Sequence, residues 1–354
     1  VWTQGERFGT IGCSIGGRIY EITTHRTEVY SADSRKPEVA FGDDLRDDLE
    51  RRDFTVNAMA VDLVRRELVD PFDGRGDLAR RLLRTPVEPE VAFSEDPLRM
   101  LRAARFHAGY ALVPAPELTA AVTAMGERME IVSAERIREE LDKLIHLADP
   151  TPGLRFLFDT GLLRWVVPEL VDLDRSAIEA VGRRVAAVEN RPATRWAALL
   201  LDVDDPGVRL HALRSSKAHQ RAVAELLAAQ RWLDAGTVPS ELSAIRRAVA
   251  AMKQVSIETT IDFLRSVDVA GAHTQVLERL AGSVAELRGS EPDIDAPVAL
   301  LTGAEVIALL GIDEGPEVGR AMQGLRELRL DEGVVAPDEA ARRLTAWWAE
   351  GERA

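Results

Sequence analysis

The sequence has 354 residues, of which 46% are hydrophobic and 29% charged, enough for a folded protein of more than one domain. It has no run near the roughly 20 apolar residues of a membrane-spanning helix. Its one cysteine, Cys13, excludes a disulfide framework within the chain and a zinc site built from several cysteines. We therefore expect a cytoplasmic protein without a membrane partner. The net charge of −14 argues against nucleic acid as a partner, unless positive charge is concentrated locally.

Two β-rich runs, Phe8–Ile15 and Arg18–Arg26, are joined by Gly16-Gly17. Two glycines between such runs predict a tight hairpin turn. Because side chains alternate along a strand, one face of this hairpin is expected to belong to a core; it consists of Ile11, Cys13, Ile15, Arg18, Tyr20 and Ile22. Glu21 lies on the opposite, open face.

The next segment predicts a helix from Asp43 to about Met59, followed by a short hairpin with arms Ala58–Leu63 and Leu68–Asp70. Turn-forming residues from Asp70 to Gly76 predict a domain exit. Beyond Asp77 the pattern is almost entirely helical. Ser94 is expected to cap a helix through Phe106, and Ser133 one through His146. The absence of a fixed repeat favours an irregular all-α region over a solenoid.

The segment Ser94–Phe106 has the strongest chemical pattern. On one helix, Glu95, Arg99 and Arg102 would lie at i, i+4 and i+7, with Asp96 beside Arg99. A carboxylate next to a guanidinium offers the acceptors and directed donors that can recognise the edge of a base. Arg102 and Arg105 could hold phosphates. The alternative is an ordinary surface helix with internal ion pairs, and this segment alone favours that alternative.

A second cluster is formed by Arg51, Arg52 and Asp53 in the middle of the predicted helix. These side chains could bind a triphosphate and a ribose hydroxyl. They could equally form a solvated charged face, which is the usual meaning of such a run.

Six motifs occur in a fixed order: Phe8-Gly9-Thr10, Tyr20–Arg26, Arg51–Ala60, Asp70-Pro71-Phe72, Glu95–Arg102 and Ser133–Ile137. Together they resemble the successive motifs of class II tRNA nucleotidyltransferases, the superfamily of CCA-adding enzymes and bacterial poly(A) polymerases. The composition and the run Arg35–Val39 most resemble actinobacterial members. Residues 300–348 resemble the C-terminal part of the same family.

The resemblance implies an α+β fold, with a partial polymerase-β-like nucleotidyltransferase head followed by a long all-α neck, body and tail. The expected boundaries are 1–78 for the head, 79–150 for the neck, 151–290 for a body with a degenerate HD-like region, and 291–354 for the tail. The implied function is addition of CCA to tRNA 3′ ends, with CTP and ATP as substrates. Asp70–Asp77 would be the flexible link between head and neck.

The resemblance also implies roles for single residues. Arg52 and Asp53 would contact the phosphates and ribose of the incoming nucleotide. Glu95, Asp96 and Arg99 would form the template that hydrogen-bonds the base, with Glu95 orienting Arg99. Arg102 and Arg105 would be further nucleotide-binding positions; these seven are the expected nucleotide-binding residues.

The sequence departs from the family at the metal site. Family members carry a glycine-rich turn and an Asp-x-Asp pair that binds Mg²⁺ before the first of these strands. We expect those ligands upstream of residue 1, so this chain alone is expected to be truncated and inactive. Glu21 could supply an extra carboxylate for catalysis, or be a plain surface acid. The Asp-x-Asp matches at Asp172, Asp202 and Asp293 are interpreted as turns and helix caps.

Alternatives remain open. Arg195–Asp202 resembles a metal-binding HD region with leucine in place of a ligand histidine, so a hydrolase is not expected. Within the family, a poly(A) polymerase or an enzyme that adds only CC or only A would share these motifs. From another class, the chain could be a tRNA-binding remnant without catalysis.

Overall fold

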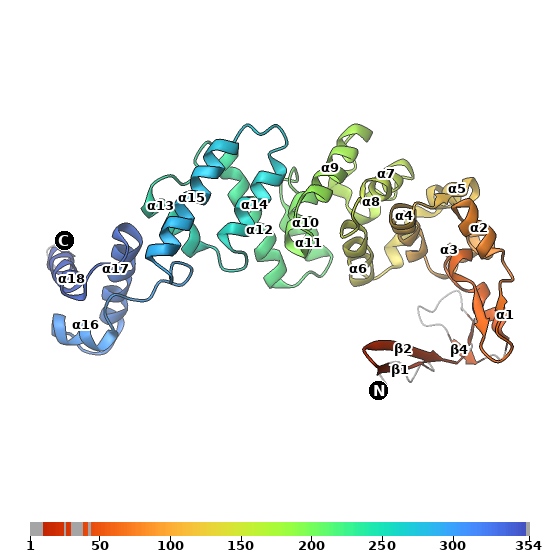
Figure 1. Ribbon diagram of the computed structural model, residues 1–354, viewed down its shortest axis with the longest axis horizontal. Helices are drawn as coiled ribbons and strands as arrows, with labels where there is room; N and C mark the ends of the chain where they lie inside the picture. The colour runs from red at the N-terminus through yellow and green to blue at the C-terminus, as the bar shows by residue number, and fades with distance from the viewer. Residues whose placement is uncertain (1–9, 25, 30–37, 42–43, 352–354) are drawn as a thin grey trace. The chain divides into compact units, whose positions relative to one another are not determined.

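The computed structural model describes residues 10–24, 26–29, 38–41 and 44–351. The predicted strand start at Phe8, the helix start at Asp43 and residues 35–37 lie outside this part. The chain divides into two compact units, Val1–Ala186 with Ala212–Arg214, and Ala187–His211 with Ser215–Ala354. Figure 1 follows both from the N-terminal strands to the C-terminal helices.

The predicted first hairpin is confirmed. Strands β1 (Thr10–Ile15) and β2 (Arg18–Thr23) pair antiparallel with Ile15 opposite Arg18. Gly16 and Gly17 have φ of 58° and 78°, the left-handed values that a two-residue turn requires. The predicted core face is wrong for the described chain, because Ile11, Ile15, Tyr20 and Ile22 are 41–66% exposed. No described element covers them, so alternation alone misjudged their burial.

The next segment holds two short antiparallel strand pairs and two short helices. They are β3 (Arg26–Val29) with β4 (Glu38–Phe41), α1 (Leu45–Glu50), the 3-10 helix η2 (Thr55–Asn57), and β5 (Ala60–Asp62) with β6 (Glu67–Val69). The predicted hairpin of 58–70 is thus confirmed. The continuous helix to Met59 is wrong, because the chain becomes extended at Phe54 (φ −138°, ψ 153°). That turn buries the Phe54 ring completely.

Helix α2 (Gly74–Arg80) begins inside the predicted turn-rich segment. The two carboxylate oxygens of Asp70 accept hydrogen bonds from the backbone N–H of Gly74 and Arg75 at 2.7 and 2.9 Å. Strand β7 (Leu82–Leu83) then pairs parallel with β8 (Val113–Pro114). The expected head boundary at residue 78 therefore lies within α2.

The rest of the first unit is helical. Its elements are α3 (Pro89–Glu95), α4 (Leu98–Tyr110), α5 (Pro116–Met125), η3 (Gly126–Ile131), α6 (Ala134–Ile145), α7 (Thr151–Asp159), α8 (Leu163–Val166), η4 (Pro168–Leu170) and α9 (Arg175–Ala187). Helix α4 packs against α6 and α7. Leu101, Leu141 and Leu157 of these three helices are buried. Ser133 caps α6 as predicted, since its hydroxyl accepts from the Arg136 N–H.

The second unit is all helix in its described residues. It consists of α10 (Pro192–Leu199), α11 (Pro206–Ala212), α12 (Lys217–Asp234), α13 (Leu242–Ala251), α14 (Ile257–Val267), α15 (Thr274–Ser290), α16 (Gly303–Leu310), α17 (Pro316–Glu332) and α18 (Pro337–Gly351). One core joins α13, α14 and α15, and a second joins α16, α17 and α18. Among described residues, no helix has the length and apolarity to cross a bilayer. The α+β arrangement with a long helical part is confirmed.

Candidate functional site

The predicted base-reading residues lie at a corner between two helices. A single helix from Ser94 to Phe106 was wrong: Glu95 ends α3, and α4 starts at Leu98. The cause is Pro97, which disfavours helical geometry in the residue before it. Asp96 is accordingly extended, with φ −140° and ψ 98°. The Asp96 carboxylate turns to the Leu98 N–H (3.2 Å) and to Arg136 on α6 (2.7 Å).

Arg99 is nevertheless beside Glu95, as the spacing predicted. Its Nη1 donates to Glu95 Oε2 at 3.1 Å and to the Ala92 carbonyl at 3.0 Å, while Nη2 donates to the Arg51 carbonyl. The residue is only 8% exposed. Arg99 therefore ties the corner to the backbone of the Arg51–Asp53 segment, and its guanidinium orientation is fixed from two sides.

The Arg51–Asp53 segment follows α1 and does not lie in mid-helix as predicted. Asp48, buried on α1, accepts from Arg51 at 2.6 Å and from Arg52 at 3.0 Å. Burial acts to raise the pKa of Asp48, but hydrogen bonds and charge from the two arginines outweigh it and lower that pKa. The Arg52 side chain is 51% exposed, so its guanidinium is open to solvent from this turn.

Asp53, the next residue, is bound by α4. Its Oδ2 accepts from Arg102 Nε at 2.9 Å and from Arg102 Nη2, while Oδ1 accepts from the Phe54 N–H and the Asn57 side chain. Asp53 and Arg102 are 49 residues apart in sequence. The structure thus brings together two predicted nucleotide-binding residues that the sequence assigned to separate motifs.

Glu140 on α6 is a member of this cluster that sequence reasoning missed. It is 2% exposed and accepts from Arg102 Nη1 (3.1 Å), Arg105 Nε (2.7 Å) and Lys143 Nζ (2.8 Å). Burial acts to raise its pKa, but hydrogen bonds from Lys143 and Arg105 and the nearby arginine charges lower it overall. Its spacing from Ile137 and Leu144 puts it on the apolar stripe of α6, and that signal could have identified it.

Two aromatic rings, those of Phe54 and Phe106, pack beside the same cluster. The rings of Phe54 and Phe106 lie 5.1 Å apart between centroids. The guanidinium of Arg105 lies 4.7 Å from the Phe106 centroid and that of Arg102 5.6 Å, within the range of cation–π attraction. Packing and charge therefore both hold the two arginines to α4 and the Phe54 turn.

A second anchor lies behind the turn at Asp77 of α2, which is fully buried. Its carboxylate accepts from the Thr55 hydroxyl at 2.8 Å, from Arg84 Nε at 2.9 Å and from Arg80 at 2.8 Å. Burial favours a higher pKa for Asp77, yet these hydrogen bonds lower it. The end of the segment proposed as a flexible link is therefore tied to η2.

The predicted acidic positions elsewhere have mostly local roles. Glu21 is exposed on β2, opposite Gly12, and no described contact joins it to the arginine cluster. Asp174 caps α9 through the Ala177 N–H (2.8 Å), and Asp293 accepts from the Val298 N–H (2.8 Å), which confirms their interpretation as a cap and a turn. In the described part of the chain, no three His, Cys, Asp or Glu side chains gather as a metal site would require.

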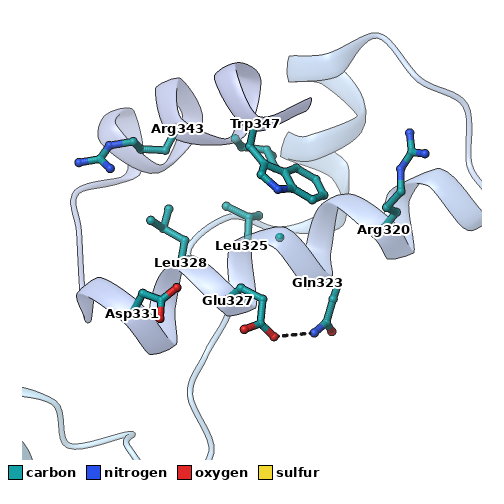
Figure 2. A pocket seen from close by; sticks show the side chains of 10 residues that line it. Arg320, Gln323, Leu325, Glu327, Leu328, Asp331, Arg343 and Trp347 are labelled. Atoms are coloured by element: carbon teal, nitrogen blue, oxygen red, sulfur yellow. Dashed lines mark hydrogen bonds between the residues drawn. The ribbon is translucent and has the colours of Figure 1, made fainter. Parts of the chain in front are cut away.

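The second unit holds a separate pocket of about 480 Å³ between α17 and α18. Figure 2 shows Trp347 and Arg343 on α18 facing Leu325 and Leu328 on α17, with Arg320 at one side. None of the predicted nucleotide-binding residues lines it. The arginine cluster of α4 and α6 is therefore the candidate site.

Two family models match segments of the first unit. Residues 1–84 match the family model described as the poly A polymerase head domain, and residues 113–173 match the probable RNA and SrmB-binding site of polymerase A. A CCA-adding enzyme of Lactobacillus gasseri is 30% identical over 95% of this chain and 81% of its own length. An A-adding tRNA nucleotidyltransferase of Deinococcus radiodurans is 32% identical over 95% of this chain and 87% of its own length.

Among solved structures, the Bacillus stearothermophilus CCA-adding enzyme in complex with CTP superimposes with a TM-score of 0.70 at 25% identity. The match covers 99% of this chain and 85% of that one. The predicted fold class, a polymerase head followed by a long helical region, is confirmed by this likeness together with the head-domain match.

Proposed function

Because the chain belongs to the class II tRNA nucleotidyltransferase family, we propose that it adds CMP and AMP, from CTP and ATP, to the 3′ end of tRNA. Family membership makes it a tRNA nucleotidyltransferase. The observation that carries the finer proposal is the continuous network from Asp53 through Arg102 to Glu140 and Arg105. It joins motifs far apart in sequence into one cationic surface with an exposed Arg52.

We propose the following division of roles on this surface. Arg52, exposed at the turn, contacts the triphosphate, and Asp53, which already accepts from Arg102, accepts from the ribose hydroxyl. Asp96 and Arg99 at the α3–α4 corner hydrogen-bond the base, with Glu95 orienting Arg99. Arg102 and Arg105 stabilise negative charge on the phosphates. The tRNA 3′-oxygen would form the new bond to the α-phosphorus while pyrophosphate leaves.

Magnesium is the proposed cofactor, and it would stabilise the attacking oxygen and the leaving pyrophosphate. The described residues do not fit a magnesium site by themselves, because no three acidic, histidine or cysteine side chains lie together in them. No described residue is assigned to hold the ion, and Glu21 as a catalytic carboxylate stays a prediction. An assay of residues 1–354 with added Mg²⁺ tests whether these residues suffice for nucleotide addition.

The tRNA backbone needs positive charge, and the helical segments differ in it. Residues 151–290 carry 18 Lys and Arg against 17 Asp and Glu, whereas residues 291–354 carry 6 against 14. We propose that phosphates of the tRNA contact the neck and body, because an acidic tail repels them. The head, neck, body and tail boundaries and a cytoplasmic location also remain proposals.

The proposal is tested with the complete polypeptide and two tRNAs, one lacking CCA and one ending in CC. CTP and ATP are supplied separately and together. A CCA-adding enzyme extends the first tRNA with CTP and completes it when ATP is added. Lack of incorporation on both tRNAs, despite tRNA binding in a mobility-shift assay, would instead identify a binding remnant.

A second candidate is an A-adding enzyme, favoured by the 32% identity to the Deinococcus radiodurans relative. That enzyme would extend the tRNA ending in CC with one AMP and leave the tRNA lacking CCA unchanged. A poly(A) polymerase would add many adenosines to either. The same two substrates therefore separate all the alternatives.

A further inference from the structure

The carboxylate of Asp96, between α3 and α4, is bound by a residue of a third helix, α6. Arg136 lies in the first turn of α6, and its Nη2 donates to Asp96 Oδ2 at 2.7 Å across 40 residues of sequence. The other oxygen, Oδ1, accepts from the Leu98 N–H at 3.2 Å. With one partner on each oxygen, the plane of the carboxylate is fixed, while both oxygens keep further acceptor capacity. The side chain is 26% exposed, so that capacity is open to a ligand.

The corner itself is held independently of Arg136. Arg128 of η3 donates to the Ser94 carbonyl at 3.0 Å, and Arg99 is bound by Ala92, Glu95 and Arg51. Removing the Arg136 guanidinium therefore leaves the Asp96 carboxylate bound only by the Leu98 N–H, without releasing the α3–α4 backbone or Arg99. This separation makes the contribution of Arg136 measurable by itself.

We propose that Arg136 is a positioning residue that orients the Asp96 carboxylate toward the exocyclic amino group of cytosine or adenine; this rests on the proposed function. Cytosine and adenine present an amino donor where uracil and guanine present a carbonyl acceptor. A fixed carboxylate accepts from the first pair and repels the second. A carboxylate free to rotate turns away from a carbonyl and loses that discrimination. Arg136 thus acts on selectivity more than on rate.

The test compares Arg136→Gln with Arg138→Gln in the complete polypeptide. Arg138 is on the same helix, but donates to the Arg214 carbonyl at 2.6 Å and makes no described contact with Asp96. For Arg136→Gln, the ratio of kcat/KM for CTP over UTP should fall about tenfold, with a smaller change in kcat for CTP. Arg138→Gln should keep the wild-type ratio, because any weaker tRNA binding affects both nucleotides equally. Arg136→Lys should restore part of the ratio.

A double-variant comparison and a binding measurement complete the test. In an Asp96→Asn background, Arg136→Gln should change selectivity no further, because the carboxylate is already gone. Calorimetric binding of CTP and UTP gives a readout that does not need turnover, and circular dichroism confirms folding. A wild-type protein without preference for CTP over UTP would refute the proposed function. Wild-type preference that persists in Arg136→Gln, or independent effects in the double variant, would overturn the role of Arg136 alone.

Discussion

Two buried glutamates, Glu140 in the first unit and Glu291 in the second, each form ion pairs with two arginines from other helices. At Glu140 the arginine side chains of Arg102 and Arg105 stay 28% and 15% exposed. At Glu291, Arg246 donates at 2.8 Å and Arg329 also binds, and their side chains are only 8% and 3% exposed. The first cluster presents cations to solvent, whereas the second encloses them. Similar ion pairs thus hold the proposed binding surface in one case and a helix junction in the other.

The enclosed cluster fastens α13 to α17 and to the segment between α15 and α16. Arg246 also donates to the Asp331 carbonyl at 3.1 Å, and Arg329 to Asp293 at 2.8 Å. Gly333 closes over it with φ 85°, where a Cβ would lie 2.6 Å from both Arg246 and Glu291. Each of these charged side chains has an oppositely charged partner within the cluster. The comparison predicts that substitution of Glu291 mainly lowers stability, whereas substitution of Glu140 mainly lowers nucleotide incorporation.

The largest effect is expected for Glu291→Ala. It leaves the buried guanidinium of Arg246 without a carboxylate partner and that of Arg329 with Asp293 alone, which costs about 3–5 kcal/mol of unfolding free energy. Urea unfolding followed by circular dichroism measures it, and nucleotide selectivity should be unchanged in the folded protein. The matched control is Glu327→Ala. Glu327 is an exposed residue of α17 that pairs with Arg247 of α13, so its removal should change stability little. Equal stability of the two variants would contradict the structural role of the Glu291 cluster.

Glu140→Gln should act mainly on function. The amide keeps the shape but binds Arg102 and Arg105 less strongly, so kcat/KM for both nucleotides should fall about tenfold. Single-turnover incorporation measures the change. Lys143→Gln serves as the control, since it removes the exposed cation but leaves both arginines on the glutamate. If the two variants have the same kinetics, the orientation of the arginines by Glu140 does not matter.

A smaller effect is expected for Arg52→Ala. The Arg52 side chain is half-exposed, and Arg51 would still bind the buried Asp48 carboxylate, so the unfolding free energy should stay near wild type. Loss of one phosphate contact should weaken CTP and ATP binding about fivefold, as measured by calorimetry. A large loss of stability, or unchanged affinity for both nucleotides, would remove Arg52 from the proposed phosphate site.

The most gradual effect is on acid stability. Glu140 and Glu291 both have a pKa lowered from the ordinary 4.5 in the folded chain. Their stabilisation is therefore complete above the unfolded pKa and is lost as pH falls through the lower, folded pKa. Thermal unfolding midpoints measured downward from pH 5 should fall less steeply in Glu140→Gln and Glu291→Gln than in wild type. Parallel curves for all three proteins would contradict these pKa directions.

Local signals predicted much of this fold. Gly16-Gly17 fixed the turn of the first hairpin, and Ser133 marked the start of α6, because each acts within a few residues of chain. The series of motifs identified the family. The roles of the individual site residues stay predictions, although the pairing of Glu95 with Arg99 survived the break before α4.

Long-range contacts could not be predicted from local sequence patterns. Asp96 was expected to pair with Arg99 on one helix, but Pro97 turns the chain and Arg136 binds the carboxylate instead. The bond from Arg102 to Asp53 likewise joins segments that no local spacing relates. Glu140 was overlooked because its burial is set by the helices packed around α6, and only its place on the apolar stripe of that helix pointed to it. Such contacts depend on tertiary packing and not on propensity.

The turn that carries Arg52 is fastened at both ends, by Arg99 and Arg102 of α4 on one side and by Asp77 of α2 on the other. The segment cannot yield independently of the α3–α4 corner. A nucleotide bound with its base at the α3–α4 corner and its phosphates at the Arg52 turn would therefore span a fixed distance. Because the turn does not adjust to the base, we expect a base of the wrong shape to displace the phosphates from their binding position. Discrimination at the base would then become misalignment at the reacting phosphorus.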